Sequence, residues 1–179
     1  MKNLKNLFAI LTLTLLLSAC SEDNANKVFK IDGVFGLKLA AQGPGLTEGY
    51  LEDNKPFDFT PSSVHKSFNS YTFSVTPNTH KIYGIKITGP KELPSASCKE
   101  QRNEIIKETL AKLGDTSTLR IHENGNEWKI TEGNNRSIII NCERTLTPTS
   151  RQLVMTYRDA SLSKLSFVEW DQHQDDITK

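Results

Sequence analysis

The sequence predicts an α+β fold, in which an antiparallel β-sheet built from a hairpin and a meander packs against one main α-helix and carries one disulfide. Two observations lead to this prediction. Several short segments alternate apolar and polar residues with the period of two that is typical of half-buried strands, and Gly, Asn and Pro separate them. Between two groups of such segments, residues 97–113 repeat their apolar positions with a helical period and stop before Gly114.

The first part of the domain combines short strands with a long irregular segment. Residues 28–39 alternate well enough to form strands that glycines interrupt. Residues 41–66 have no clear period, and a segment of this length is either a surface loop with a function or a poorly ordered insert. The aromatic residues in it predict that part of the segment packs on the domain: Tyr50, Phe57 and Phe59.

A hairpin and the main helix follow. The hairpin has Tyr71, Phe73 and Val75 on one face of its first strand, a turn at 77–80, and Tyr83, Ile85 and Ile87 on one face of its second. Ser97 and Glu100 fit a capping box at the helix start. We expect the helix to bury Ile106, Leu110 and Leu113 and to expose a solvated polar face with Lys99, Arg102, Asn103, Lys107 and Lys112.

Three strands in a meander and a C-terminal strand complete the predicted sheet. Asn-Gly and Gly-Asn turns separate the meander strands, which carry Leu119 and Ile121, then Trp128 and Ile130, then Ile138, Ile140 and Cys142. Leu153, Met155 and Tyr157 supply one further strand. Residues 162–170 fit either a short helix or a final strand, and residues 172–179 are expected to be a polar tail without regular structure.

The N-terminal segment has the layout of a secretory signal. Lys2 and Lys5 precede an apolar run at 8–17, which is about half the length that a membrane-spanning helix requires. An ordinary cleaved signal also ends in small residues, but here a cysteine follows them in Leu17-Ser18-Ala19-Cys20. This stretch resembles the lipobox of bacterial lipoproteins.

The lipobox resemblance implies cleavage before Cys20, a thioether-linked diacylglycerol on its sulfur, and N-acylation, so the anchor would hold the protein on a membrane. Ser21, where an aspartate usually retains such proteins in the inner membrane, implies the periplasmic face of the outer membrane; Glu22 and Asp23 leave the inner membrane as the alternative. The expected organisation is a signal peptide at 1–19, a lipidated cysteine and polar tether at 20–27, one domain at 28–171 and the tail at 172–179.

Cys98 and Cys142 remain once Cys20 is assigned to the lipid. An exported cysteine pair in an oxidising compartment predicts a disulfide, and no neighbouring histidine or C-x-x-C spacing favours a reactive thiol. The body of the chain looks like small uncharacterised exported proteins of Gram-negative bacteria, on the hairpin segments 68–71 and 83–85 together with this cysteine pair. That resemblance implies no activity.

The charge balance excludes a broad electrostatic attraction to nucleic acid. The whole chain has a net charge of +1, and loss of residues 1–19 removes Lys2 and Lys5, which leaves 20 basic and 21 acidic residues. We therefore expect no nucleic-acid partner.

The sequence predicts no catalytic set, metal site or cofactor. S-x-x-K occurs at 63–66 and 161–164 without the partner motifs that give it meaning, and neither G-x-S-x-G nor H-E-x-x-H occurs. The predicted function is capture of a periplasmic protein partner, as an inhibitor or immunity-type protein or as an accessory of an envelope complex. The candidate contact residues lie in the irregular segment: Gly43, Pro44, Gly45 and Tyr50. A small-molecule or lipid-binding protein and an enzyme with a dispersed site are the alternatives.

Overall fold

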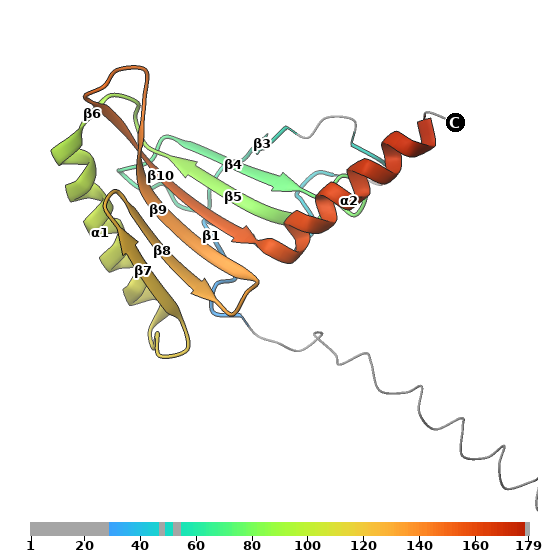
Figure 1. The fold of residues 1–179 in the computed structure, drawn as a ribbon, viewed down its shortest axis with the longest axis horizontal. Helices are drawn as coiled ribbons and strands as arrows, with labels where there is room; N and C mark the ends of the chain where they lie inside the picture. The colour runs from blue at the N-terminus through green and yellow to red at the C-terminus, as the bar shows by residue number, and fades with distance from the viewer. Residues whose placement is uncertain (1–28, 47–48, 52–54, 178–179) are drawn as a thin grey trace, which may run out of the picture.

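The computed structural model describes residues 29–46, 49–51 and 55–177, and it confirms the α+β fold with one disulfide (Figure 1). Residues 17–20, which resemble a lipobox, lie outside the described residues. The strands are β1 (Gly33–Val34), β2 (Leu37–Lys38), β3 (Phe57–Asp58), β4 (Ser70–Val75), β5 (Ile82–Thr88), β6 (Leu93–Pro94), β7 (Arg120–Asn124), β8 (Glu127–Glu132), β9 (Arg136–Arg144) and β10 (Ser150–Asp159). The helices are α1 (Ser95–Leu113) and α2 (Ala160–Ile177).

Strand β10 is the centre of the main sheet. The strand order is β3-β4-β5-β10-β9-β8-β7, every pairing is antiparallel, β6 also pairs with β10, and β1 and β2 form a separate small ribbon. The last strand in the sequence therefore joins the predicted hairpin to the predicted meander. This junction depends on pairing between distant segments, which alternation within each strand does not reveal.

The strand register places the core on one face of the sheet. One row of paired residues crosses five strands and is buried throughout: Tyr71, Ile87, Met155, Ile140 and Trp128. Helix α1 covers this face at β9 and β10, while residues 29–68 supply the buried side chains that cover it at β4 and β5. The residues one step along each strand point to the opposite face and form a mostly polar row: Thr72, Lys86, Thr156, Ile139 and Lys129.

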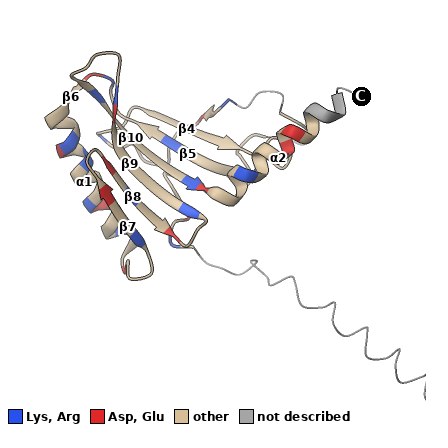
Figure 2. Ribbon diagram, in the orientation of Figure 1, with Lys and Arg blue, Asp and Glu red and all other residues tan. Residues whose placement is uncertain are grey.

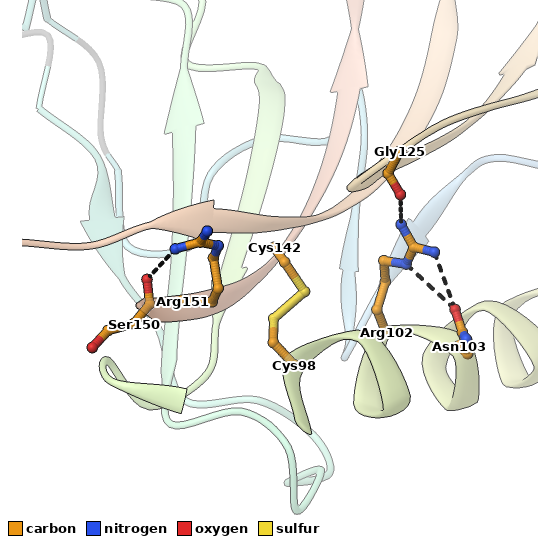
Figure 3. The surroundings of a disulfide bond; sticks show 7 residues. All are labelled: Cys98, Arg102, Asn103, Gly125, Cys142, Ser150 and Arg151. Carbon is orange, nitrogen blue, oxygen red and sulfur yellow. Dashed lines mark hydrogen bonds between the residues drawn. A yellow bond between two sulfur atoms is a disulfide. The ribbon is translucent and has the colours of Figure 1, made fainter. Parts of the chain in front are cut away.

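The predicted disulfide joins α1 to the sheet. Cys98 and Cys142 are both buried, their Cα atoms are 6.1 Å apart, and Figure 3 shows the bridge running from the start of α1 to β9. One turn further along α1, the Arg102 guanidinium donates to the Gly125 carbonyl oxygen at 2.8 Å and pairs with the Glu123 carboxylate at 2.9 Å. The prediction that Arg102 lies on the solvated face is wrong, because these acceptors at the β7–β8 turn hold it under that hairpin.

Helix α1 also begins differently from the prediction. It starts at Ser95, with Pro94 before it, and no side chain caps it, so Ser97 lies inside the first turn rather than at a capping box. Its most buried positions are Cys98, Arg102, Ile105 and Thr109, whereas Ile106, Leu110 and Leu113 are half-buried beside them. The predicted end is confirmed, because Gly114 adopts a φ of +65° and its N–H donates to the Leu110 carbonyl oxygen at 3.1 Å.

A bulge shifts the apolar face of β5. Ser74 pairs with Gly84 but Val75 pairs with Ile82, so β5 contains one extra residue, Tyr83, between these two pairs. Ile82 therefore occupies the buried position that the sequence assigned to Tyr83, which is half-buried.

The C-terminal segment is a helix, and it continues into the expected tail. The Asp159 carboxylate caps α2 by accepting from the Leu162 N–H at 3.1 Å, and α2 runs to Ile177, so the expectation of an irregular tail from residue 172 is wrong as far as Ile177. Helix α2 projects past the end of the sheet (Figure 1) and buries Ser163, Ser166 and Glu169. No helix in the described residues is both long and apolar enough to cross a membrane.

Glu169 fixes α2 to the β4–β5 turn. Its carboxylate accepts from the backbone N–H of Asn78 at 2.7 Å and of Thr79 at 3.3 Å, and from the Thr79 hydroxyl at 3.0 Å. These bonds satisfy a buried charge.

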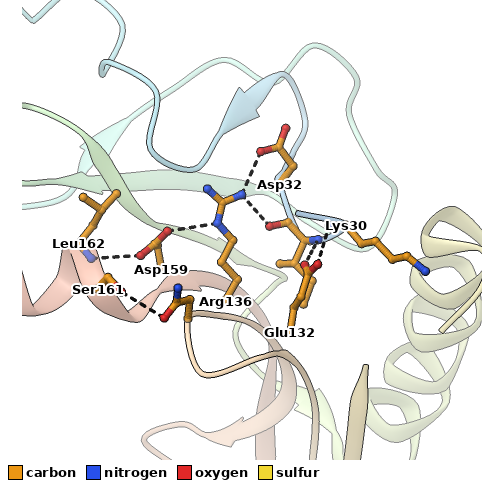
Figure 4. Close-up of polar contacts among 9 residues, drawn as sticks. Lys30, Asp32, Glu132, Arg136, Asp159, Ser161 and Leu162 are labelled. Carbon is orange, nitrogen blue, oxygen red and sulfur yellow. Dashed lines mark hydrogen bonds and ion pairs between the residues drawn. The ribbon is translucent and has the colours of Figure 1, made fainter. Parts of the chain in front are cut away.

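Arg136 ties the beginning of the described chain to the end of the sheet. Its guanidinium is 6% exposed and donates to the carboxylates of Asp159 at 3.2 Å and Asp32 at 3.0 Å, and to the Ile31 carbonyl oxygen at 3.1 Å (Figure 4). The Phe29 ring stacks over it, with its centroid 4.1 Å from the guanidinium carbon. Two carboxylates, a carbonyl oxygen and an aromatic ring therefore contact this buried cation.

Replacing both bridge cysteines (Cys98→Ala with Cys142→Ala) is expected to lower the free energy of unfolding by about 2–4 kcal/mol, because the crosslink closes a long loop. Urea unfolding followed by circular dichroism, with and without reductant, measures the loss. Reductant should shift the midpoint of the natural chain and leave that of the variant unchanged. Equal midpoints for both chains would contradict the stabilising role of the bridge.

Arg136→Met is expected to lower the free energy of unfolding by about 3–5 kcal/mol, because Asp159 is then left with a buried charge that lacks its cation. Adding Asp159→Asn should recover part of the loss, since the amide removes the charge and still offers an oxygen to the Leu162 N–H. A double-mutant cycle, in which urea unfolding is measured for the two single variants and the double variant, gives the coupling energy between the two side chains. Strictly additive losses would show that the two side chains are not coupled.

Candidate functional site

The irregular segment is ordered where it meets the sheet. Ala40 donates to the Ile82 carbonyl oxygen at 2.8 Å, Ile82 donates to the Ala41 carbonyl oxygen at 2.9 Å, and Gly43 donates to the His80 carbonyl oxygen at 2.9 Å. These bonds lay residues 40–43 along the start of β5. The chain then turns outward at Pro44 and Gly45.

Pro44 and Gly45 form part of the rim of an apolar pocket. The pocket has a volume of about 580 Å³, and we call it the aromatic pocket after its main lining residues: Phe35, Leu37, Phe57, Phe59 and Phe73. Gly36, Asp58, Thr60 and Ser62 complete the lining. It lies at the β3 edge of the sheet, on the face that carries the core.

The β1–β2 turn forms one wall of the pocket. Phe35 and Gly36 both have positive φ, +53° and +91°, which makes a tight two-residue connection. The Ser62 N–H donates to the Phe35 carbonyl oxygen at 3.0 Å and holds the turn in place. Gly36 is required here, because a Cβ would lie 3.1 Å from the Ser62 hydroxyl in a backbone conformation that side chains rarely adopt.

Aromatic contacts fix the opposite wall. Phe57 stacks on Phe73 with ring centroids 5.4 Å apart, and Phe59 meets the edges of Tyr71 and Phe73 at 5.9 and 6.1 Å. Phe35 makes an edge contact with Tyr71 at 5.3 Å from the other side. The rings are therefore held by their neighbours and not free to fill the pocket.

Strand β3 leaves a sheet edge open beside the pocket. It pairs with β4 on one side, and the described residues contain no strand on its other side. Phe57 pairs with Phe73, and the Phe59 N–H donates to the Tyr71 carbonyl oxygen, so the alternation of an antiparallel ladder directs the N–H and C=O of Asp58 away from β4. An exposed carboxylate, a free backbone donor and acceptor, and an apolar pocket thus lie together.

The other predicted contact residues have different roles. Gly43 is buried, and a Cβ on it would lie 2.7 Å from Leu46 Cδ1 and 3.0 Å from Val75 Cγ1. Tyr50 packs away from the pocket, on α2: its ring stacks on His173 with centroids 3.6 Å apart and lies 6.0 Å from Trp170. Burial raises the pKa of the Tyr50 hydroxyl, and the negative charge of Glu169 raises it further.

The arrangement can bind an apolar group and an extended backbone. Asp58 is the one acid or base among the described residues that line the pocket. Among the described residues, no three His, Cys, Asp or Glu side chains come together as metal ligands. Pro44 and Gly45, which the sequence singled out as candidate contact residues, line the pocket. The sequence did not predict the pocket itself, because its aromatic residues come from three separate segments that only the fold brings together.

Comparison of the chain with known proteins found no family model, curated protein or solved structure that matches it significantly.

Gly43→Ala is expected to lower the free energy of unfolding by about 1–3 kcal/mol, because the added methyl group overpacks the space between Leu46 and Val75. Pro44→Ala, at the adjacent exposed position, is the matched control and should change stability by less than about 0.5 kcal/mol. Thermal and urea unfolding of both variants measure the difference. An unchanged stability for Gly43→Ala would mean that the close approach is absent in solution.

Proposed function

We propose that this chain is a lipoprotein of the bacterial envelope that captures a protein partner without catalysing a reaction. The observation that carries the proposal is the aromatic pocket beside the open edge of β3. The lipobox supports an anchor on Cys20 at the periplasmic face of the outer membrane, and a buried disulfide suits an oxidising compartment.

An extended segment of the partner fits this site best. Its backbone can pair with the outward N–H and C=O of Asp58, which adds a strand to the sheet. Successive side chains of a strand point to opposite faces, so one apolar side chain of the partner can enter the aromatic pocket while its neighbours remain outside. The pocket volume, about 580 Å³, is in the usual range for pockets that enclose a bound group.

Two roles agree with this mode of binding. An inhibitor or immunity-type protein would use the site to hold a toxin or a wall-degrading enzyme, and an accessory protein would use it to join an envelope complex. Both need one dominant partner, so the identity of that partner distinguishes them.

In-cell crosslinking from the site itself tests the proposal. A photo-crosslinking amino acid at Thr60 of the full lipoprotein, an exposed residue of the pocket lining, should trap one abundant envelope protein, which mass spectrometry identifies. Pro44→Asp places a charge on the pocket rim, and Asp58→Pro removes the outward N–H while leaving the bonds from β3 to β4 in place. Each variant should weaken capture about tenfold or more, as loss of a central contact does.

Leu146→Asp is the matched control, because Leu146 is a fully exposed apolar residue outside the pocket. It should leave capture unchanged. If the Pro44→Asp and Asp58→Pro variants fold and still capture the partner, the aromatic pocket and the β3 edge are not the binding site. Crosslinks only to scattered porins and other lipoproteins would favour a small-molecule or lipid ligand instead.

A further inference from the structure

A second depression lies on the polar face of the sheet, away from the aromatic pocket. Its volume is about 450 Å³, and it lies where β10 leads into α2 and the β8–β9 turn begins. Besides Arg136, which is paired with Asp32 and Asp159, four cationic side chains from four different elements line it, and we call it the basic depression: Arg120, Lys129, Arg158 and Lys164. Figure 2 shows basic residues at the end of β10 and on the first turns of α2.

The four cations have no acidic partner in the described part of the chain. None of them has a carboxylate oxygen within 4.0 Å, whereas Lys86, further along the same face, pairs with Glu143 at 3.8 Å. The nearest buried acid, Asp159, is already neutralised by Arg136 and by the α2 cap. The depression therefore combines local positive charge with a chain whose net charge is close to zero.

Hydrogen bonds hold two of the cations in position and leave donors free. One nitrogen of Arg158 donates to the Ser163 hydroxyl at 2.8 Å, and one nitrogen of Arg120 donates to the Asn134 amide oxygen at 3.3 Å. The remaining guanidinium nitrogens have no acceptor among the described residues. The Asn135 amide oxygen accepts from Ser161, which directs its NH₂ group toward other acceptors. Oriented guanidinium groups with free donors, together with amide and hydroxyl groups, are suited to phosphate oxygens.

An exposed apolar face adjoins the depression on α2. Leu165, Phe167 and Val168 are 37%, 62% and 50% exposed, and the last two lie three and four residues after Lys164, on the same side of the helix. Apolar side chains next to cations are typical of surfaces that lie in the headgroup layer of a membrane.

The described chain begins at this same end of the molecule. The Phe29 ring covers Arg136, which lines the basic depression, and Cys20 precedes Phe29 by only nine residues. Nine residues span at most about 30 Å, so an anchored Cys20 would keep the depression within reach of the membrane surface.

We propose that the basic depression binds the phosphate group of a membrane lipid headgroup, with Leu165, Phe167 and Val168 in the adjoining headgroup layer. This inference rests on the proposed anchor at Cys20 and not on the aromatic pocket. The bound lipid would orient the domain on the membrane.

Native mass spectrometry of the full chain, purified in a neutral detergent, tests the proposal. Phosphatidylglycerol is the anionic probe, phosphatidylcholine is the probe without net charge, and inorganic phosphate is the competitor. Lys129→Gln with Arg158→Gln should reduce phosphatidylglycerol binding about tenfold or more, since each of the two cations contributes roughly fivefold at a membrane surface. Lys99→Gln with Lys107→Gln, which removes two exposed cations from α1, is the matched control and should change nothing.

The lipid preference decides the outcome. Stronger binding of phosphatidylglycerol than of phosphatidylcholine, lost in the first double variant alone, would support the site. Equal binding of the two lipids, or equal losses in both double variants, would overturn it. If inorganic phosphate at the same concentration displaced the lipid, the site would bind free phosphate, and the proposal of a lipid headgroup would be wrong. The mass of the chain in the same spectrum shows whether Cys20 is acylated, which tests the proposed anchor separately. Pro44→Asp, which alters the aromatic pocket, should leave lipid binding intact, so loss of protein capture and loss of lipid binding can be distinguished.

Discussion

The buried guanidinium of Arg136 is the contact on which the arrangement of the molecule depends. It joins the entering segment at Ile31 and Asp32, the start of β9, and Asp159 at the junction of β10 and α2. A cation that is 6% exposed costs several kcal/mol of desolvation unless partners surround it, so these segments have one favourable arrangement. The same contact places the beginning of the described chain beside the basic depression, and it neutralises the acid that would otherwise cancel the charge there.

The central position of β10 separates the two proposed surfaces. The aromatic pocket lies on the core-bearing face at the β3 edge, and the basic depression lies on the polar face beyond β10. No described residue lines both depressions, so a membrane lipid and a protein partner would not compete for these side chains. An anchored domain that is oriented through one face would leave the β3 edge open to the periplasm.

Local pattern predicted the parts of this fold whose burial follows a simple period. Alternation predicted β4, β8, β9 and β10, and the two cysteines that remain once Cys20 is set aside predicted the bridge. The pattern failed where polar residues are buried for specific partners: Arg102 under the β7–β8 turn, and Ser163, Ser166 and Glu169 beneath α2, which exposes Leu165, Phe167 and Val168 instead. The bulge at Tyr83 and both depressions depend on contacts between distant segments, which no local period records.

The shortness of β3 determines how a partner can use the open edge. A long exposed edge strand would invite indiscriminate strand addition, and short edges flanked by charge and proline prevent it. Here β3 has two residues, Lys55 and Pro56 precede it, and Pro61 follows shortly after. Backbone pairing at Asp58 can then contribute only a few hydrogen bonds, at about 1 kcal/mol each. Burial of an apolar side chain against Phe57, Phe59 and Phe73 must therefore supply most of the affinity, and the shape of the aromatic pocket must supply the selectivity.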